Sequence, residues 1–357
     1  MTVLISATEH NPRNSEASLV VLSDGSWLLA WSSFSASATP PAGTERLEPY
    51  AREWAHSRDN NPAEIVAVRS FDRGRSWGSR MTLVGDDAGI NVMQPSLLLL
   101  HDGRLAMSYS HRESPDAAQR FFTSSADGGQ TWSPKVDMTN LGGYVTGAHD
   151  RMIRLRSGRL LQPCNRLDEG VASTVITVSD DEGLSWRPTW QIELPGVTPG
   201  YLSGIWEASV VERANGTLLL GARTARGVVY AAESDSSGDS WSAPVPLSVA
   251  APSAPVLLRS LPDEAGPGER LLLFHNSTVE PGQPMLGRRT PLVVSTSEDG
   301  GQLWRMGNAL EDDPERWFHY PACTVVDDVL VMTYSVTEPE TRQWSLAVKT
   351  LQLSEVI

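Results

Sequence analysis

The sequence predicts an all-β protein, a six-bladed β-propeller with four-stranded antiparallel blades. Three observations support this: a box of the form Ser-x-Asp-x-Gly-x-x-Trp recurs along the chain, a second series of tight turns alternates with it, and helical periodicity is weak throughout. Six units of about 60 residues fill the chain, which is the length of a blade of four short strands. We therefore expect one propeller domain over residues 1–357.

The box is the strongest internal repeat. Its Gly-x-x-Trp pair occurs at Gly74/Trp77, Gly129/Trp132, Gly183/Trp186, Gly238/Trp241 and Gly301/Trp304. A Ser stands four residues before each Gly, and these Ser positions step by 55, 54, 55 and 63 residues. Four copies carry Asp two residues before the Gly (Asp72, Asp127, Asp181 and Asp299), and the fourth copy has Ser236 there. A turn carboxylate that bonds to backbone amides, followed by a Gly with positive φ, is typical of a hairpin.

The second series of turns separates pairs of strand-like apolar runs. Its members are Asp24-Gly25, Asp102-Gly103, Ser157-Gly158, Asn215-Gly216 and Asp327-Asp328, and the insertion at residues 262–269 displaces one further member. We expect the ring to close where the C-terminal strands near residues 345–353 meet an N-terminal strand near residues 3–6.

Composition limits the classes of partner. The chain has 29 basic and 43 acidic residues, a net charge of −14, which argues against a nucleic-acid partner because phosphate binding needs clustered Lys and Arg.

We expect two free buried thiols at Cys164 and Cys323, although one bridge between them is an alternative. The N-terminus does not have the pattern of a signal peptide and no apolar run is long enough to span a bilayer, so we expect a cytoplasmic protein that does not bind membranes.

A series of such boxes is the Asp box, or bacterial neuraminidase repeat, and the chain resembles the sialidase (neuraminidase) superfamily over almost its whole length. Asp boxes also occur on propellers without hydrolase activity, so we expect the box aspartates to be structural. The resemblance implies a site with three arginines that bind the substrate carboxylate, a Tyr nucleophile paired with a Glu, and an Asp acid/base. It implies no metal and no organic cofactor.

Two of these groups are expected near the N-terminus. Arg13 follows the opening segment and precedes a strand, as the first arginine of the family does, although a Pro stands before it rather than two residues after it. Asp59 is the expected acid/base, with Glu53 and Glu64 as alternatives. The turns at Asp24 and Asp102 are 78 residues apart, so roughly 23 extra residues lie in this loop, and long loops are often functional.

The other groups follow in the family's order. Glu207 begins a strand and Arg223 ends the next one, so both are expected at the same rim. Arg289 resembles the third arginine, with Arg288 as its neighbour, and Tyr320 resembles the nucleophile.

This set of residues suits hydrolysis of a 2-keto acid sugar. Guanidinium groups bind a carboxylate with charge-assisted, partly bidentate hydrogen bonds. A neutral Tyr hydroxyl is not repelled by the charge of the substrate, and Glu207 would accept its proton while Asp59 protonates the leaving group. The predicted activity is a retaining exo-glycosidase acting on terminal sialic acid. A glycosidase for another ulosonic or uronic acid and a non-catalytic glycan- or protein-binding propeller remain the alternatives.

Several further residues are expected near the pocket by position. His149, Asp150 and Arg151 follow a Gly-rich segment and are candidates for contact with substrate hydroxyls, or else form a solvated strand start. Candidates for the rim are Trp54, Asn91, Trp206 and Trp317.

Overall fold

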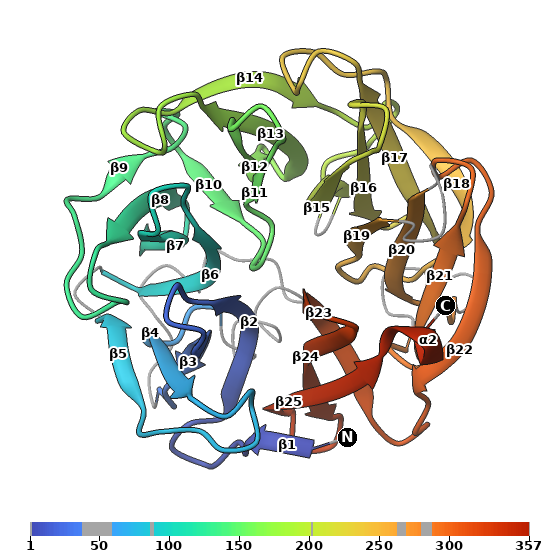
Figure 1. Ribbon diagram of the computed structural model, residues 1–357. Helices are drawn as coiled ribbons and strands as arrows, with labels where there is room; N and C mark the ends of the chain where they lie inside the picture. Colours follow the sequence, from blue (N-terminus) through green and yellow to red (C-terminus); the bar gives the residue numbers. More distant parts are fainter. Residues whose placement is uncertain are drawn as a thin grey trace.

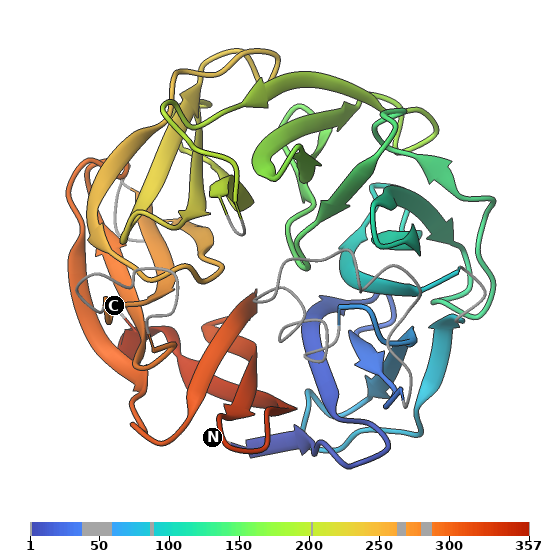
Figure 2. The ribbon, with the colours of Figure 1, turned by 180° about the vertical axis from the view of Figure 1, so that it is seen from behind.

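The computed structural model describes residues 2–37, 59–85, 89–200, 203–262, 269–279 and 288–356. These residues are almost entirely β-structure, with one short helix, α2 (Leu353–Val356). The strands are arranged in a ring around a common centre, which is visible from both sides (Figures 1 and 2). The predicted all-β class is confirmed.

Within the described residues the strands pair into six antiparallel units, of which three lie in the first half of the chain. The first contains β2 (Arg13–Val21), β3 (Trp27–Phe34), β4 (Ala63–Ser70) and β5 (Met81–Val84). The second contains β6 (Asn91–Leu99), β7 (Leu105–Ser114), β8 (Ala117–Ser125) and β9 (Val136–Asp137). In the third, β10 (Tyr144–Gly147) and β11 (Ile153–Arg154) both pair with β12 (Leu160–Asp168), followed by β13 (Val171–Ser179) and β14 (Arg187–Ile192).

The other three units follow the same order. The fourth contains β15 (Ser203–Glu212), β16 (Leu218–Thr224), β17 (Val228–Ser234) and β18 (Val245–Ala250). The fifth contains β19 (Leu257–Pro262), β20 (Glu269–Asn276), β21 (Leu292–Ser297) and β22 (Arg305–Glu311). The last contains β23 (Trp317–Val326), β24 (Val329–Glu338), β25 (Gln343–Gln352) and, from the other end of the chain, β1 (Thr2–Ile5).

The two ends of the chain meet in the last unit, as the sequence predicts. Val3 of β1 pairs with Ala347 of β25 in an antiparallel ladder. On the inner side, the Thr324 hydroxyl donates a 2.7 Å hydrogen bond to the carbonyl of Leu19. The first and last units are therefore held together at both their inner and outer strands.

Serine side chains join the inner strands of neighbouring units. Each hydroxyl accepts hydrogen bonds from backbone N–H groups of the next unit, at 2.8–2.9 Å: Ser18 from Leu97, Ser96 from Arg151 and Met152, and Ser209 from Leu258. Because inner strands of different units do not share a full ladder, these side chains satisfy backbone donors that would otherwise be buried without a partner.

The Asp boxes form turns, as predicted, and they lie between the third and fourth strands of a unit. In the first box the Ser70 hydroxyl donates to Asp72 at 2.9 Å and accepts from the Gly74 N–H at 2.8 Å. Bonds from the Ser76 hydroxyl and N–H lower the pKa of Asp72 to about 2. The box carboxylate therefore stabilises its own turn. The displaced turn expected at residues 262–269 lies almost wholly outside the described residues.

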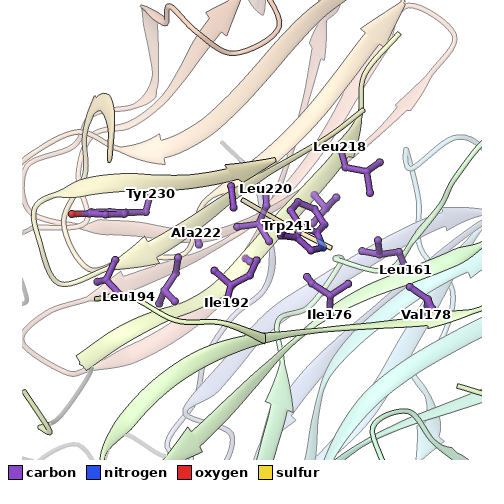
Figure 3. Packing of buried hydrophobic residues seen from close by; sticks show 14 of the residues in the cluster. Leu161, Ile176, Val178, Ile192, Leu194, Leu218, Leu220, Ala222, Tyr230 and Trp241 are labelled. Carbon is purple, nitrogen blue, oxygen red and sulfur yellow. The ribbon is translucent and has the colours of Figure 1, made fainter. Parts of the chain in front are cut away.

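The core lies between neighbouring units, and Figure 3 shows the cluster between the third and fourth. Leu161 and Ile176 of β12 and β13 contact Leu218 and Leu220 of β16, and the box residue Trp241 is buried among them. Burying a large apolar side chain contributes about 1.5–3 kcal/mol. The box Trp thus packs one unit against the next.

Cys164 and Cys323 are free and buried, as expected. None of the described helices has the length and apolar character needed to cross a membrane.

Candidate active site

Four inner strands carry a β-bulge at corresponding places. Each bulge holds a non-glycine residue at positive φ: Glu16 (61°), Gln94 (62°), Glu207 (49°) and Tyr320 (56°). This conformation costs an L-residue about 1–2 kcal/mol and is concentrated at functional sites. Bulges also occur often next to active sites, where they redirect a side chain. The same β-bulge therefore positions all four residues, two of which, Glu207 and Tyr320, are predicted catalytic groups.

Glu207 and Arg223 form a buried ion pair, and both were expected at one rim. The Arg223 Nη1 atom donates to Glu207 Oε2, and the two side chains are only 4% and 7% exposed. The Glu207 N–H donates to Asn165 Oδ1 of the preceding unit at 2.7 Å, which holds the bulge. Trp206 pairs with Arg223 in the β15–β16 ladder, and its ring lies 4.9 Å from the guanidinium.

Ser253, between β18 and β19, joins two of the predicted arginines. Its hydroxyl accepts from Arg223 Nε at 2.9 Å, and its carbonyl accepts from Arg289 Nη2 at 3.2 Å. The Arg289 guanidinium lies 5.7 Å from the centre of the Tyr320 ring. Arg288 is exposed. Of the two neighbouring arginines, Arg289 is the one beside Tyr320.

Arg13 is fully buried between two aromatic rings. The rings of Phe34 and Trp344 each lie 4.2 Å from its guanidinium. Trp344 also contacts Tyr320, with ring centres 5.8 Å apart. Continuous contacts thus run from Arg13 through Trp344 to Tyr320 and on to Arg289.

Asp59 accepts hydrogen bonds from neighbouring strands through both its side chain and its backbone. Its carboxylate accepts from Arg13, and its carbonyl accepts from Asn91 Nδ2 at 2.6 Å and from Arg112. The side chain is 65% accessible. Desolvation by the surrounding protein raises the pKa of this carboxyl, but the charges of Arg13, Arg112 and Arg223 outweigh it and hold the pKa below its usual value. Asp59 is therefore ionised while it remains beside Arg13.

The alternative acids lie elsewhere. Glu64 pairs with Arg80 at 3.2 Å on the surface. Glu53 and the rim candidate Trp54 lie outside the described residues. Trp317, the other rim candidate, is partly buried at the start of β23.

Tyr320 is a neutral phenol in this environment. Burial and then the charge of Glu207 raise its pKa above the usual value, against the opposing effect of Arg289 and Arg223. A neutral phenol needs a base before it can act as a nucleophile, and Glu207 is the carboxylate with the strongest electrostatic effect on it.

The 149–151 segment binds mainly to the protein framework. His149 Nε2 lies 3.1 Å from the Tyr320 carbonyl oxygen. Asp150 accepts from Ser18 at 2.8 Å and from Arg259. Arg151 donates to the Val256 carbonyl at 2.8 Å and to the His149 carbonyl at 3.0 Å. All three residues are buried, and of the three it is His149 that touches the predicted nucleophile.

Sequence reasoning missed several groups around this site. Glu16 had a detectable signal, because Glu16-Ala17-Ser18 repeats Glu207-Ala208-Ser209 and both triplets precede two aliphatic residues. Arg112, Ser253 and Trp344 had no such signal, since their importance comes from contacts with distant parts of the chain.

Among the ranges described above, no three His, Cys, Asp or Glu side chains form a group able to hold a metal ion. The grouped arginines, carboxylates and phenol are suited instead to binding an organic acid and to proton transfer.

A ring of Asp-box units in which contacts bring arginines, carboxylates and a tyrosine together defines a sialidase-like fold. The chain belongs to the BNR repeat-like domain family, whose sequence profile matches residues 50–333. No curated protein sequence matches the chain.

Solved structures share the fold at low sequence identity. A protein of unknown function from Dyadobacter fermentans has a TM-score of 0.70 and 19% identity, covering 98% of this chain and 97% of that one. The intramolecular trans-sialidase of Ruminococcus gnavus has a TM-score of 0.74 and 13% identity, covering 99% and 98%. The NanB sialidase of Streptococcus pneumoniae has a TM-score of 0.73 and 12% identity, covering 100% and 71%. The predicted resemblance is confirmed, because the chain has the BNR repeat-like domain and shares the fold of sialidases. Identities this low establish the fold alone.

Proposed function

We propose that the chain is a six-bladed propeller enzyme, a retaining exo-glycoside hydrolase that removes terminal sialic acid or a similar carboxylated sugar. The observation that carries this proposal is the continuous set of contacts linking Arg13, Trp344, Tyr320, Arg289, Ser253 and Arg223. It brings together three arginines that are distant in sequence.

The three arginines give the site its affinity for an acid. A chain with a net charge of −14 repels anions on average, so an anionic substrate needs a local positive cluster. Arg13, Arg223 and Arg289 supply planar donors that match a carboxylate. The leech intramolecular trans-sialidase, at 12% identity and a TM-score of 0.74, was solved with 2,7-anhydro-Neu5Ac, and the Ruminococcus gnavus enzyme with oseltamivir carboxylate. Both ligands are consistent with an acidic substrate.

In the proposed reaction, Glu207 accepts the phenolic proton of Tyr320 as the Tyr320 oxygen forms a bond to the anomeric carbon of the sugar. The glycosidic bond breaks, and Asp59 gives its proton to the departing oxygen. Asp59 then removes a proton from water as the water oxygen bonds to the anomeric carbon. The bond from the Tyr320 oxygen to that carbon breaks, and the Tyr320 oxygen takes back its proton from Glu207. Two displacements at one carbon retain its configuration.

Asp59 must hold a proton before it acts as an acid. In the ligand-free protein Arg13 favours the ionised form. A substrate carboxylate on Arg13 competes for the same guanidinium and brings a second negative charge beside Asp59, and both effects raise the pKa of Asp59.

Hydrolysis of 4-methylumbelliferyl α-N-acetylneuraminic acid by the wild type and by Tyr320→Phe tests the proposal. Phenylalanine keeps the ring and removes the nucleophile, so kcat should fall by about 10³-fold or more. Proton NMR of the first product should show the α-anomer. Wild-type-like turnover in the variant would rule out the Tyr320 mechanism.

Aryl glycosides of other ulosonic and uronic acids, assayed in parallel, distinguish the substrate class. Tight glycan binding by calorimetry without hydrolysis of any of them would favour a non-catalytic binding propeller.

A further inference from the structure

Glu16 duplicates the setting of the proposed base Glu207, yet it has no part in the reaction above. Both residues occupy a bulge at positive φ on an inner strand, both begin a Glu-Ala-Ser triplet, and each is paired with an arginine. Glu207 pairs with Arg223, whereas Glu16 pairs with Arg13 at 3.2 Å. A buried carboxylate in a strained backbone conformation is costly, and such costs are typical of functional sites.

Arg13 is shared by two carboxylates before any ligand arrives. Its Nη2 atom faces Glu16 Oε1, its Nη1 atom donates to Asp59, and its Nε atom donates to Ser15 Oγ at 2.8 Å. The second oxygen of Glu16, Oε2, is buried and has no hydrogen-bond partner among the described residues. A ligand carboxylate at Arg13 would be the third acid around one guanidinium. Repulsion among these charges favours protonation of the acid that is most buried.

The titratable and charged groups that interact electrostatically with Glu16 come from six parts of the chain: Arg13 on β2, Asp59 before β4, Arg120 on β8, Tyr144 on β10, Glu207 on β15 and Tyr320 on β23. Burial raises the pKa of both tyrosines, so both stay neutral near pH 7, and the charge of Arg13 holds the pKa of Asp59 below its usual value, so Asp59 stays ionised there before a ligand binds. Burial raises the pKa of Glu16 to about 7, against the opposing charge of Arg13. Glu16 therefore changes its charge near neutral pH.

The geometry points to a proton-coupled binding site. When a carboxylated ligand binds at Arg13, Glu16 takes up one proton from solvent on Oε2, and the negative charge around Arg13 stays constant. This inference rests on the proposed function and adds a role for Glu16 in ligand affinity. By linkage, affinity for the acid should fall about tenfold per pH unit above neutral pH in the wild type, and much less in a variant without this carboxyl.

Titration calorimetry with 2,3-didehydro-2-deoxy-N-acetylneuraminic acid tests the coupling. Binding heats in phosphate and in Tris at about pH 8 differ in proportion to the protons taken up. We expect the wild type to take up close to one proton more than Glu16→Gln does, because any proton taken up by Asp59 is common to both proteins. The matched control is Glu212→Gln, on the same strand as Glu207 but paired with Arg156 at 3.4 Å, and it should behave like the wild type.

The wild type alone provides a second test if Glu16→Gln does not fold. At about pH 5.5 Glu16 already holds its proton and contributes no uptake, whereas its contribution should rise to about one proton by pH 8. Binding at pH 8 without proton uptake would overturn the coupling and leave the proposed function intact, as would undiminished uptake in a folded Glu16→Gln. If the wild type and the control both fail to bind the ligand, the proposed function fails and the coupling fails with it.

Discussion

His149 Nε2 lies 3.1 Å from the backbone carbonyl oxygen of Tyr320, and the two rings are 5.6 Å apart. Because a carbonyl only accepts hydrogen bonds, the imidazole must carry its proton on Nε2. Burial, and then the charge of Arg151, hold the pKa of His149 well below its usual range, so the ring is neutral. A histidine from the third unit thus holds the bulge that carries the proposed nucleophile in the last unit.

We expect His149→Leu to lower kcat by about 10- to 100-fold with little change in KM, because it releases the Tyr320 bulge and leaves the arginines in place. His149→Gln keeps an N–H donor at a similar reach and should recover much of the loss. Steady-state kinetics on the aryl sialoside checks both variants. Equal loss of activity in the two variants would contradict a role for this hydrogen bond.

Ser253→Ala should act on binding instead. It removes the acceptor of the Arg223 Nε–H, so we expect KM to rise about tenfold while kcat changes little, since one hydrogen bond to a charged group is worth about 1.5–3 kcal/mol. Ser260→Ala is the control, because Ser260 contacts Glu269 at 3.4 Å on β20. A fall in kcat with unchanged KM would show that Ser253 does not position the arginine for binding.

Stability should depend on pH through Glu16. Burial raises its pKa from an ordinary value of 4.5 to about 7, so the folded state binds the proton more tightly than the unfolded chain does. This contribution is fully present below about pH 4.5 and is lost as the pH rises to about 7, by roughly 3 kcal/mol. Glu16→Gln should lack this loss. Urea unfolding at several pH values measures it, and parallel pH profiles for the two proteins would be inconsistent with a raised pKa.

Substitutions at two glycines distinguish the stability cost of steric crowding from the cost of backbone strain. Both Gly183 (φ +88°) and Gly158 (φ +92°) have positive φ, but a Cβ on Gly183 would lie 2.2 Å from the Phe122 ring, whereas a Cβ on Gly158 would have no heavy atom within 4 Å. Gly158→Ala should cost about 1–2 kcal/mol. Gly183→Ala adds overpacking and should cost about 2–5 kcal/mol. Urea denaturation gives both values. Equal losses would mean that the third box turn moves freely away from the neighbouring unit.

The outer part of the fold was predictable because it depends on local signals. The side chains of each Asp box form hydrogen bonds within their own turn, between residues two to four positions apart, such as Ser70 to Asp72 and Gly74 to Ser70. Alternating apolar strands then set which hairpins form, and four near-equal steps between the five boxes predicted the units. The meeting of the N-terminal strand with β25 follows from the same count.

The site was partly predictable. Glu207 and Arg223 lie on neighbouring strands of one hairpin, so the local strand pairing is enough to predict their contact. Arg13, Asp59, Arg289 and Tyr320 were identified through family resemblance, and their proximity depends on the ring. The framework bonds of the 149–151 segment and the sharing of Arg13 between Glu16 and Asp59 were not predicted, because they join units far apart in sequence.

The sequence by itself determined the strands, their turns and their order, since hydrophobic alternation and turn chemistry act over a few residues. Tertiary structure alone decided which charges share the ring centre and what protonation state each prefers. The physical reason is that burial and Coulomb interactions depend on distance in space, and the ring brings residues such as Glu16 and Tyr320, more than 300 positions apart, into one electrostatic environment.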